Sequence, residues 1–195
     1  MFKVISIVIV YSILLNLPGI AQSIGTNNLT EVAASFGLRF EKEVEYRSED
    51  SAYTENIQLL KLSKKAHAMQ FRLLINKAPD DSPILIFSDI KKGIDLSEPS
   101  WLMDYNIIKG PVTKNGASQD EIFIVLYNLN QNGGLSPGDY KNLFTVKYKV
   151  ADLSGLKNNI KSSIQISNAE ASTFDGFAID IKSDRNEFKI YISRK

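Results

Sequence analysis

The residues that could perform catalysis are few in this chain. Among 195 residues there is one histidine, His67, and no cysteine. A thiol nucleophile, a cysteine-ligated zinc and a site with two histidine ligands are therefore excluded, and a serine triad would depend on His67 alone. We interpret His67 as a residue of a turn or a strand edge.

Two pairs of adjacent acids could in principle supply the carboxylates of a glycosidase. They are Glu49–Asp50 and Asp80–Asp81. A glycosidase needs its two carboxylates to face one another across the sugar, whereas neighbouring side chains on an extended chain point to opposite sides. We interpret both pairs as solvated loop residues and predict that the protein is not an enzyme.

The segment from Asn128 to Asp139 has the spacing of a calcium-binding loop, with Gly133 at the sixth position. Its first ligand position holds Asn instead of Asp, and strand-forming residues flank it instead of helices. A long hairpin connection whose turns use Gly133–Gly134 and Pro137–Gly138 explains the same residues. We favour the hairpin, keep calcium binding as the alternative, and predict neither a metal site nor a cofactor.

Aromatic side chains could provide a surface on which sugar rings stack, although such residues more often fill a core. The candidates are Trp101, Tyr105, Tyr127, Tyr140 and Tyr148. Trp101 follows Pro99–Ser100 at the start of a predicted strand. It is the residue that we expect to be exposed, and it is our candidate for carbohydrate binding.

The elements that must position these residues are short β-strands. Runs of β-branched and aromatic residues, many with a period of two, alternate with turn residues, which is typical of an all-β sandwich. Strands are expected at 38–46, 57–62, 67–76, 83–90, 101–108, 121–129, 142–150, 162–167, 177–181 and 187–193. The one helical turn that we expect within the domain lies at 154–158.

Alternation also predicts which side chains face the core. One core between two sheets should contain Phe71, Leu73, Ile124, Leu126, Phe144 and Val146. With Met69, Phe71, Leu73 and Ile75 inward, the outward row is Ala68, Gln70, Arg72 and Leu74. The strand at 121–129 should add Tyr127 and either Phe123 or Val125 to that surface. An ordinary solvated sheet face is the alternative.

The first 21 residues resemble a secretory signal peptide. Lys3 forms a basic start, an apolar run extends from Val4 to Leu17, and small residues end at Ala21. We predict cleavage after Ala21, a polar linker over 22–36 and one β-sandwich domain over 37–195. The expected location is extracellular or at the cell surface, with the periplasm as the alternative and no membrane span after cleavage.

The predicted mature chain has no net charge that would attract a polyanion. The full chain has 23 Lys plus Arg and 22 Asp plus Glu, and removal of Lys3 leaves 22 of each. Nucleic acids and anionic lipids bind surfaces with clustered excess Lys and Arg. We therefore expect no nucleic-acid partner.

Three stretches resemble the cohesin family, the dockerin-binding modules of cellulosomes and of other bacterial secreted proteins. These stretches are 56–76 (NIQLLKLSKKAHAMQFRLLIN), 120–150 (DEIFIVLYNLNQNGGLSPGDYKNLFTVKYKV) and 162–181 (SSIQISNAEASTFDGFAIDI). The resemblance implies a jelly-roll sandwich of about nine strands that binds a protein module through one sheet face. The segment 76–81 departs from the family, and so does Ala68, which stands near positions where the family presents polar residues to its partner.

These observations together predict a secreted, non-catalytic binding module. Its partner would be a protein, a dockerin-like module, held by Gln70, Arg72, Leu74 and Tyr127. A carbohydrate-binding module that takes a polysaccharide through Trp101 is one alternative. A structural subunit of a surface assembly is the other.

Overall fold

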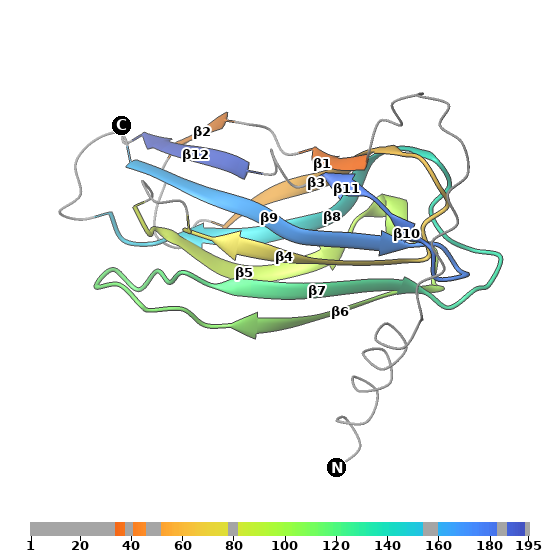
Figure 1. Ribbon diagram of the computed structural model, residues 1–195. Coiled ribbons are helices and arrows are strands. Elements are labelled where there is room, and N and C mark those ends of the chain that lie inside the picture. The colour runs from red at the N-terminus through yellow and green to blue at the C-terminus, as the bar shows by residue number, and fades with distance from the viewer. Residues whose placement is uncertain are drawn as a thin grey trace, which may run out of the picture. The chain divides into compact units, whose positions relative to one another are not determined.

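The computed structural model describes residues 34–37, 41–45, 52–77, 82–153, 160–182 and 187–193, and shows two β-sheets packed face to face (Figure 1). The predicted all-β sandwich is confirmed. The described residues contain one short 3₁₀ turn, η1 (Ile94–Leu96), and no α-helix. No helix long and apolar enough to cross a membrane is therefore found among them.

One sheet has the strand order β11-β1-β3-β8-β5. Its strands are β1 (Ala34–Gly37), β3 (Ala52–Leu62), β5 (Leu85–Lys92), β8 (Gly138–Val150) and β11 (Ile181–Lys182). Neighbouring strands run antiparallel except β1 and β11, which are parallel.

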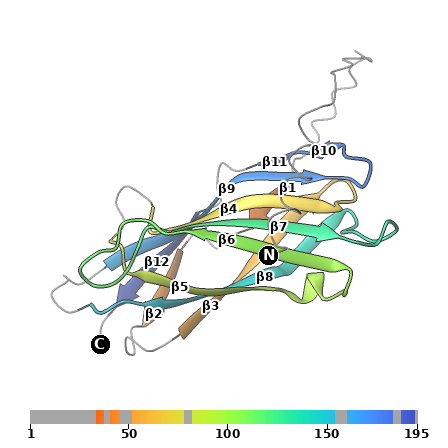
Figure 2. The same cartoon turned by 90° about the horizontal axis from the view of Figure 1, so that it is seen from below.

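The other sheet has the order β2-β12-β9-β4-β7-β6, and β10 pairs with β9 beside this path. Its strands are β2 (Glu41–Glu45), β4 (Ala68–Ile75), β6 (Trp101–Ile108), β7 (Glu121–Asn128), β9 (Ile160–Ser172), β10 (Ala178–Ile179) and β12 (Glu187–Ser193). Figure 2 shows β6, β7, β4 and β9 lying side by side. The chain crosses between the two sheets from β3 to β4, β4 to β5, β5 to β6, β7 to β8 and β8 to β9, as in a jelly roll.

The core lies between the sheets and is built by strand alternation. All six predicted core residues are buried, namely Phe71, Leu73, Ile124, Leu126, Phe144 and Val146. Phe71 from β4 and Phe144 from β8 stack across the interface with ring centroids 5.1 Å apart. The prediction that both sheets share one core is confirmed.

Several predicted boundaries were wrong. The predicted linker at 22–36 includes Ala34 and Ser35, which pair with β3 and β11, and Ala34 is fully buried. Most residues of this segment are small or polar, so the sequence shows no strand pattern there. The 3₁₀ turn at 94–96 was not expected, while the helical turn predicted at 154–158 and both acidic pairs, Glu49–Asp50 and Asp80–Asp81, lie outside the described residues.

Candidate functional site

The predicted outward row of β4 lies on the outer face of its sheet. Arg72 is exposed, and Ala68, Gln70 and Leu74 are partly exposed, whereas Met69, Phe71, Leu73 and Ile75 between and beside them are buried. The outward and inward assignments from alternation are both confirmed.

Strand β7 continues this outer face next to β4. Tyr127 lies opposite Ala68, Val125 opposite Gln70, and Phe123 opposite Arg72. We expected only one of Phe123 and Val125 on this surface, but both lie there because they are two residues apart in a regular strand. The four residues proposed from the sequence therefore lie on two paired strands, with Gln70 and Arg72 beside the middle of β7 and with Leu74 and Tyr127 towards opposite ends of the face.

The most continuous apolar feature of the face is a row of side chains along β7, which we call the β7 stripe. It consists of Phe123, Val125 and Tyr127, and Leu129 extends it just beyond the strand. Tyr127 is 38% exposed and Leu129 is 67% exposed. An apolar centre with a polar border is the usual composition of a protein interface.

Polar side chains border Phe123 and Val125 on both sides, whereas Tyr127 lies between Leu102 and Ala68. On β6, Leu102 lies opposite Tyr127, Asp104 opposite Val125 and Asn106 opposite Phe123. On the other side, the Nε2 of Gln70 on β4 donates to the Oε2 of Glu170 on β9 at 2.7 Å. The face defined by β6, β7, β4 and β9 is thus mixed, with its apolar residues concentrated on β7.

One end of the face is held by ion pairs. Glu121 accepts from the Nζ of Lys77 at 2.6 Å and from the Nη1 of Arg72 at 3.3 Å. The hydrogen bond from Lys77 is the main reason why the pKa of Glu121 lies below its ordinary value. Arg72 therefore already has a partner in the free protein, and a ligand that recruited it would compete with Glu121.

Behind this end, Asp120 is almost fully buried and satisfied. Burial by itself would raise its pKa, but hydrogen bonds from Lys109, Ser118 and Gly110, with the Lys109 charge, bring the pKa below its ordinary value. The Nζ of Lys109 lies 2.7 Å from Oδ2, and the Oγ of Ser118 lies 2.7 Å from Oδ1. We interpret this ionised carboxylate as a structural anchor of the turn that precedes β7.

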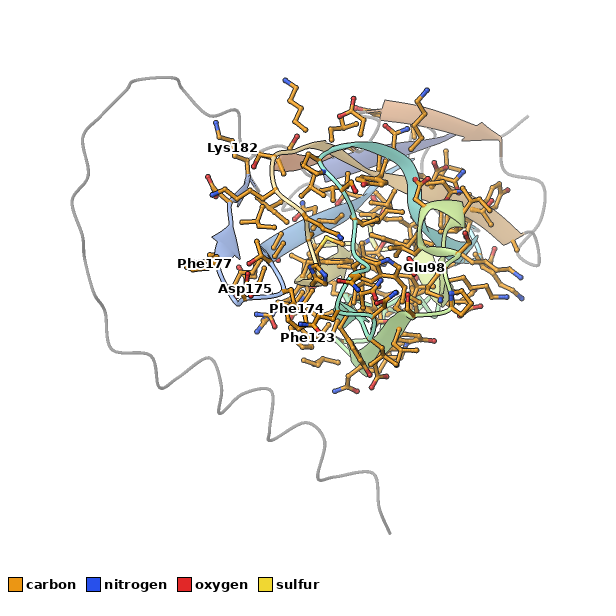
Figure 3. The ribbon with its side chains drawn as sticks, turned by 90° about the vertical axis from the view of Figure 1, so that its right-hand side faces the viewer. Glu98, Phe123, Phe174, Asp175, Phe177 and Lys182 are labelled. Atoms are coloured by element: carbon orange, nitrogen blue, oxygen red, sulfur yellow. The ribbon has the colours of Figure 1, made fainter. Side chains whose placement is uncertain are left out.

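The opposite end of the face carries aromatic residues that the sequence analysis missed. Phe174 and Phe177 lie on the tight connection between β9 and β10, and they are 51% and 71% exposed. Figure 3 shows them with Asp175 on the same side of the molecule as Phe123, away from Glu98. A Phe-Asp-Gly-Phe turn is the signal that could have revealed them, since aromatic residues at a turn have little core to occupy.

His67 supports this aromatic turn from below. Its ring meets the ring of Phe174 edge-on at a centroid distance of 5.4 Å, and its Nε2 lies 3.1 Å from the carbonyl oxygen of Gln131. The backbone N–H of His67 also donates to Ser172 at the end of β9. The sole histidine thus joins two loops at the end of the face.

The calcium-like loop uses its side-chain oxygens to shape turns. The Oδ1 of Asn128 accepts from the N–H of Asn130, and the Oδ1 of Asn130 accepts from the N–H of Asn132. Asp139 accepts from the backbone of Lys61 at 2.8 Å. No group of three or more His, Cys, Asp or Glu side chains gathers as for a metal within the described ranges.

The prediction that Trp101 is exposed was wrong. Its side chain is only 1% exposed, because it occupies an inward position of β6 and leaves Leu102 to face outward. Tyr148 is fully buried as well, and burial raises its pKa. The five aromatic residues considered for sugar stacking come from three strands in two sheets and form no common platform.

Several solved structures have a similar fold. A cohesin–dockerin complex from Clostridium thermocellum, Coh-OlpC with Doc435, matches with a TM-score of 0.58 and 15% identity, covering 89% of this chain and 100% of that chain. A type I cohesin of ScaB from Pseudobacteroides cellulosolvens matches at 0.56 and 11% identity, covering 84% and 94%. A non-cellulosomal cohesin from the archaeon Archaeoglobus fulgidus matches at 0.54 and 17% identity, covering 83% and 91%.

These similarities establish the fold of cohesin modules for this chain, as the resemblance in the sequence predicted. At the level of sequence, no family model and no curated protein matches. The fold is therefore shared at identities where individual binding residues are not expected to be kept.

Proposed function

We propose that this protein is a non-catalytic module that binds another protein through the outer face of β6, β7, β4 and β9. The observation that carries the proposal is the β7 stripe, a partly exposed apolar row with polar neighbours on both sides of Phe123 and Val125. Several of the solved cohesins with this fold are described in complexes with dockerins. A dockerin-like module is accordingly the partner that we propose.

The partner would meet the residues expected from the sequence, namely Gln70, Arg72, Leu74 and Tyr127. Tyr and Arg are frequent anchors of protein interfaces, and Tyr127 lies in the apolar row while Arg72 borders it. We further propose that the protein acts after export, which is supported by the signal-like residues 1–21. Carbohydrate binding has lost its main candidate, because Trp101 is buried.

The test is to capture a protein partner from the secretome of the source cells and measure its affinity for two variants. Replacing Gln70, Arg72 and Tyr127 together by Ala should weaken binding by about 2 kcal/mol or more, because it removes the anchors from the face. The control variant, Thr54→Ala with Lys147→Ala, changes an exposed pair on the other sheet and should bind like the unmodified protein.

Equal affinity of a folded triple variant would show that this face is not the binding site. Specific binding to a glycan array without any protein partner would favour the carbohydrate-binding alternative. Hydrolysis of a polysaccharide or peptide that disappears with one carboxylate substitution would contradict the non-catalytic proposal.

A further inference from the structure

Strand β6 forms one border of its sheet. Its eight residues pair with β7 on one side, and no strand among the described residues pairs with the other side. Figure 1 shows β6 as the outermost strand of this sheet, beyond β7. The edge of a sheet presents a row of unpaired backbone N–H and C=O groups, which is a template for pairing with another chain.

The register with β7 determines which residues of β6 direct their backbone groups outward. The N–H of Leu129, just after β7, donates to the carbonyl of Ser100, just before β6, at 2.8 Å. The direction of these groups alternates from one residue to the next along a strand. The N–H and C=O groups of Met103, Tyr105 and Ile107 therefore point away from β7, along the border of the sheet.

Only part of this row is already bonded within the chain. The N–H of Trp101 donates to the carbonyl of Glu98 at 3.1 Å, and the carbonyl of Trp101 accepts from the Nζ of Lys92 at 2.6 Å. No strand or turn of the described chain supplies such partners to the backbones of Met103 and Ile107. The exposed backbone groups are thus concentrated in the second half of β6.

The corresponding border of the other sheet, β5, is protected against edge pairing. A register shift between Phe87 and Asp89 interrupts its pairing with β8, and the Asp89 carboxylate forms an ion pair with Lys91 at 3.5 Å. Bulges and charged side chains, Lys above all, are common means of blocking a sheet edge. Strand β6 has no register shift against β7, and its only charged residue is Asp104.

The sequence of β6 is complementary to itself when two copies run antiparallel about Tyr105. The pairs across the two strands are then Leu102 with Ile108, Met103 with Ile107, and Asp104 with Asn106. Apolar residues meet apolar residues, and the carboxylate meets an amide that donates to it. Leu102 and Ile108 are 37% and 54% exposed, so both have apolar surface to bury. Antiparallel pairing about Asp104 would instead place two carboxylates opposite each other, which is unfavourable.

We propose that β6 pairs with β6 of a second copy of this chain, antiparallel about a two-fold axis at Tyr105, and forms a homodimer with one continuous sheet. The backbones of Met103 and Ile107 exchange hydrogen bonds with Ile107 and Met103 of the second copy. The Asp104 carboxylate, which accepts from the N–H of Tyr105 at 2.9 Å, turns to the Asn106 amide of the second copy. Such an interface uses the same surface on both copies, as two-fold dimers do.

The dimer goes beyond the proposed function and needs no partner protein. It would place the β7 strands of the two copies three strand spacings apart, about 14 Å, on one shared outer face. A dimer would thus present two β7 stripes side by side. The pairing itself is tested on the purified protein alone.

The first experiment measures the monomer–dimer equilibrium by sedimentation equilibrium over a series of concentrations. Leu102→Lys with Ile108→Lys places like charges opposite each other twice in the proposed dimer, and should weaken dimerisation about tenfold or more. The matched control, Leu102→Glu with Ile108→Lys, has opposite charges in the same two pairs and should dimerise within about threefold of the unmodified protein. Both variants keep Lys at position 108, opposite Glu121 of β7, so they differ only at position 102.

The second experiment tests the register by disulfide formation, which has no background because the chain has no cysteine. Positions 102 and 108 of the two copies form a non-hydrogen-bonded pair, whose Cα atoms are about 4.5 Å apart, within the range of a disulfide. A mixture of the Leu102→Cys and Ile108→Cys proteins should therefore form a covalent dimer under mild oxidation. Each variant alone should remain unlinked, because equivalent positions are far apart in this register.

Three results would overturn the inference. They are a protein that stays monomeric throughout the concentration series, equal dimerisation of the two charge variants, or a Leu102→Cys protein that crosslinks to itself as readily as to Ile108→Cys. The second result would also be expected if another surface, such as the apolar residues 4–17, held the copies together. None of these results bears on the affinity of a captured partner for the variant at Gln70, Arg72 and Tyr127, so the proposed function stands or falls separately.

Discussion

The side chain of Asn76 forms hydrogen bonds with several buried groups at once. It is fully buried, and its Nδ2 donates to the carbonyls of Leu85 and Ser118 at 2.8 and 2.7 Å. Its Oδ1 accepts from the N–H of Leu85 and from the Oγ of Ser162. One amide thus connects the start of β5, the segment before β7 and strand β9.

We predict that Asn76→Ala lowers the free energy of unfolding by about 3 kcal/mol or more, since several buried partners lose their bonds at about 1 to 3 kcal/mol each. Urea denaturation measures this. Asn76 also has a positive φ of 58°, so the control is Asn168→Ala, an exposed residue with φ 49°. The control should cost about 1 kcal/mol of backbone strain, and equal losses in both variants would contradict the role of the amide.

Individual side chains were predictable where strand alternation alone places them. Gln70, Arg72 and Tyr127 follow their strands and face outward as expected. Trp101 does not face outward as predicted. The direction of a side chain at the start of β6 depends on the register of β6 with β7, and the sequence around Trp101 does not reveal this register. Phe174 was missed for the related reason that its neighbour His67 is 107 positions away along the chain.

At the scale of elements, Gly93 lies just after β5, where the backbone of β8 leaves no room for a side chain. A Cβ at this position would lie 1.9 Å from the carbonyl oxygen of Asn142, while the Gly93 N–H donates to Leu143 at 2.8 Å. The close approach permits the turn from β5 into η1. A side chain here has no space, because the atom it would meet is backbone.

Gly93→Ala should therefore destabilise the protein by about 1 to 3 kcal/mol, the usual range for an overpacked site, as measured by thermal or urea unfolding. Gly116→Ala is the contrasting variant. Gly116 has a φ of +84° with open space around its Cβ position, so its substitution tests backbone strain without a collision. A Gly93→Ala protein as stable as the unmodified one would show that the two strands can separate without cost.

The positions of most strands followed from the sequence, but their lengths did not. The strands predicted at 142–150 and 162–167 were too short, because β8 already starts at Gly138 and β9 extends from Ile160 to Ser172, so that each has 13 residues. Long strands persist through polar residues when neighbouring strands supply hydrogen bonds on both sides. β8 lies between β3 and β5, and this tertiary support is absent from local patterns.

At the scale of the whole molecule, the sandwich depends on one apolar core without disulfides, because the chain has no cysteine. The fold class could be predicted because alternating runs recur along the chain, and each must bury one face. The pairing of β2 with β12 and of β1 with β11 could not be predicted from local patterns, because each pair joins residues from the first and the last parts of the described chain.

The contact between Phe71 and Phe144 is the central link between the two sheets, and it provides the last prediction. Each ring is fully buried, and the planes are inclined by 20° in a stacked arrangement. Replacing either Phe by Ala should cost about 3 to 5 kcal/mol through lost burial and the cavity that remains. Because each substitution also removes the stacking partner of the other, the double variant should lose less than the two single losses combined.

A double-mutant cycle in urea measures that difference, and we expect a coupling of about 0.5 to 1.5 kcal/mol. Phe144 combined with Phe177 is the control cycle, because Phe177 is 71% exposed at the β9–β10 connection. That pair should be additive, and Phe177→Ala alone should change stability by no more than about 0.5 kcal/mol. Additive losses at Phe71 and Phe144 would mean that each ring contributes only through the apolar area it buries, whereas coupling would show that the two facing rings also stabilise the contact between the sheets by interacting with each other.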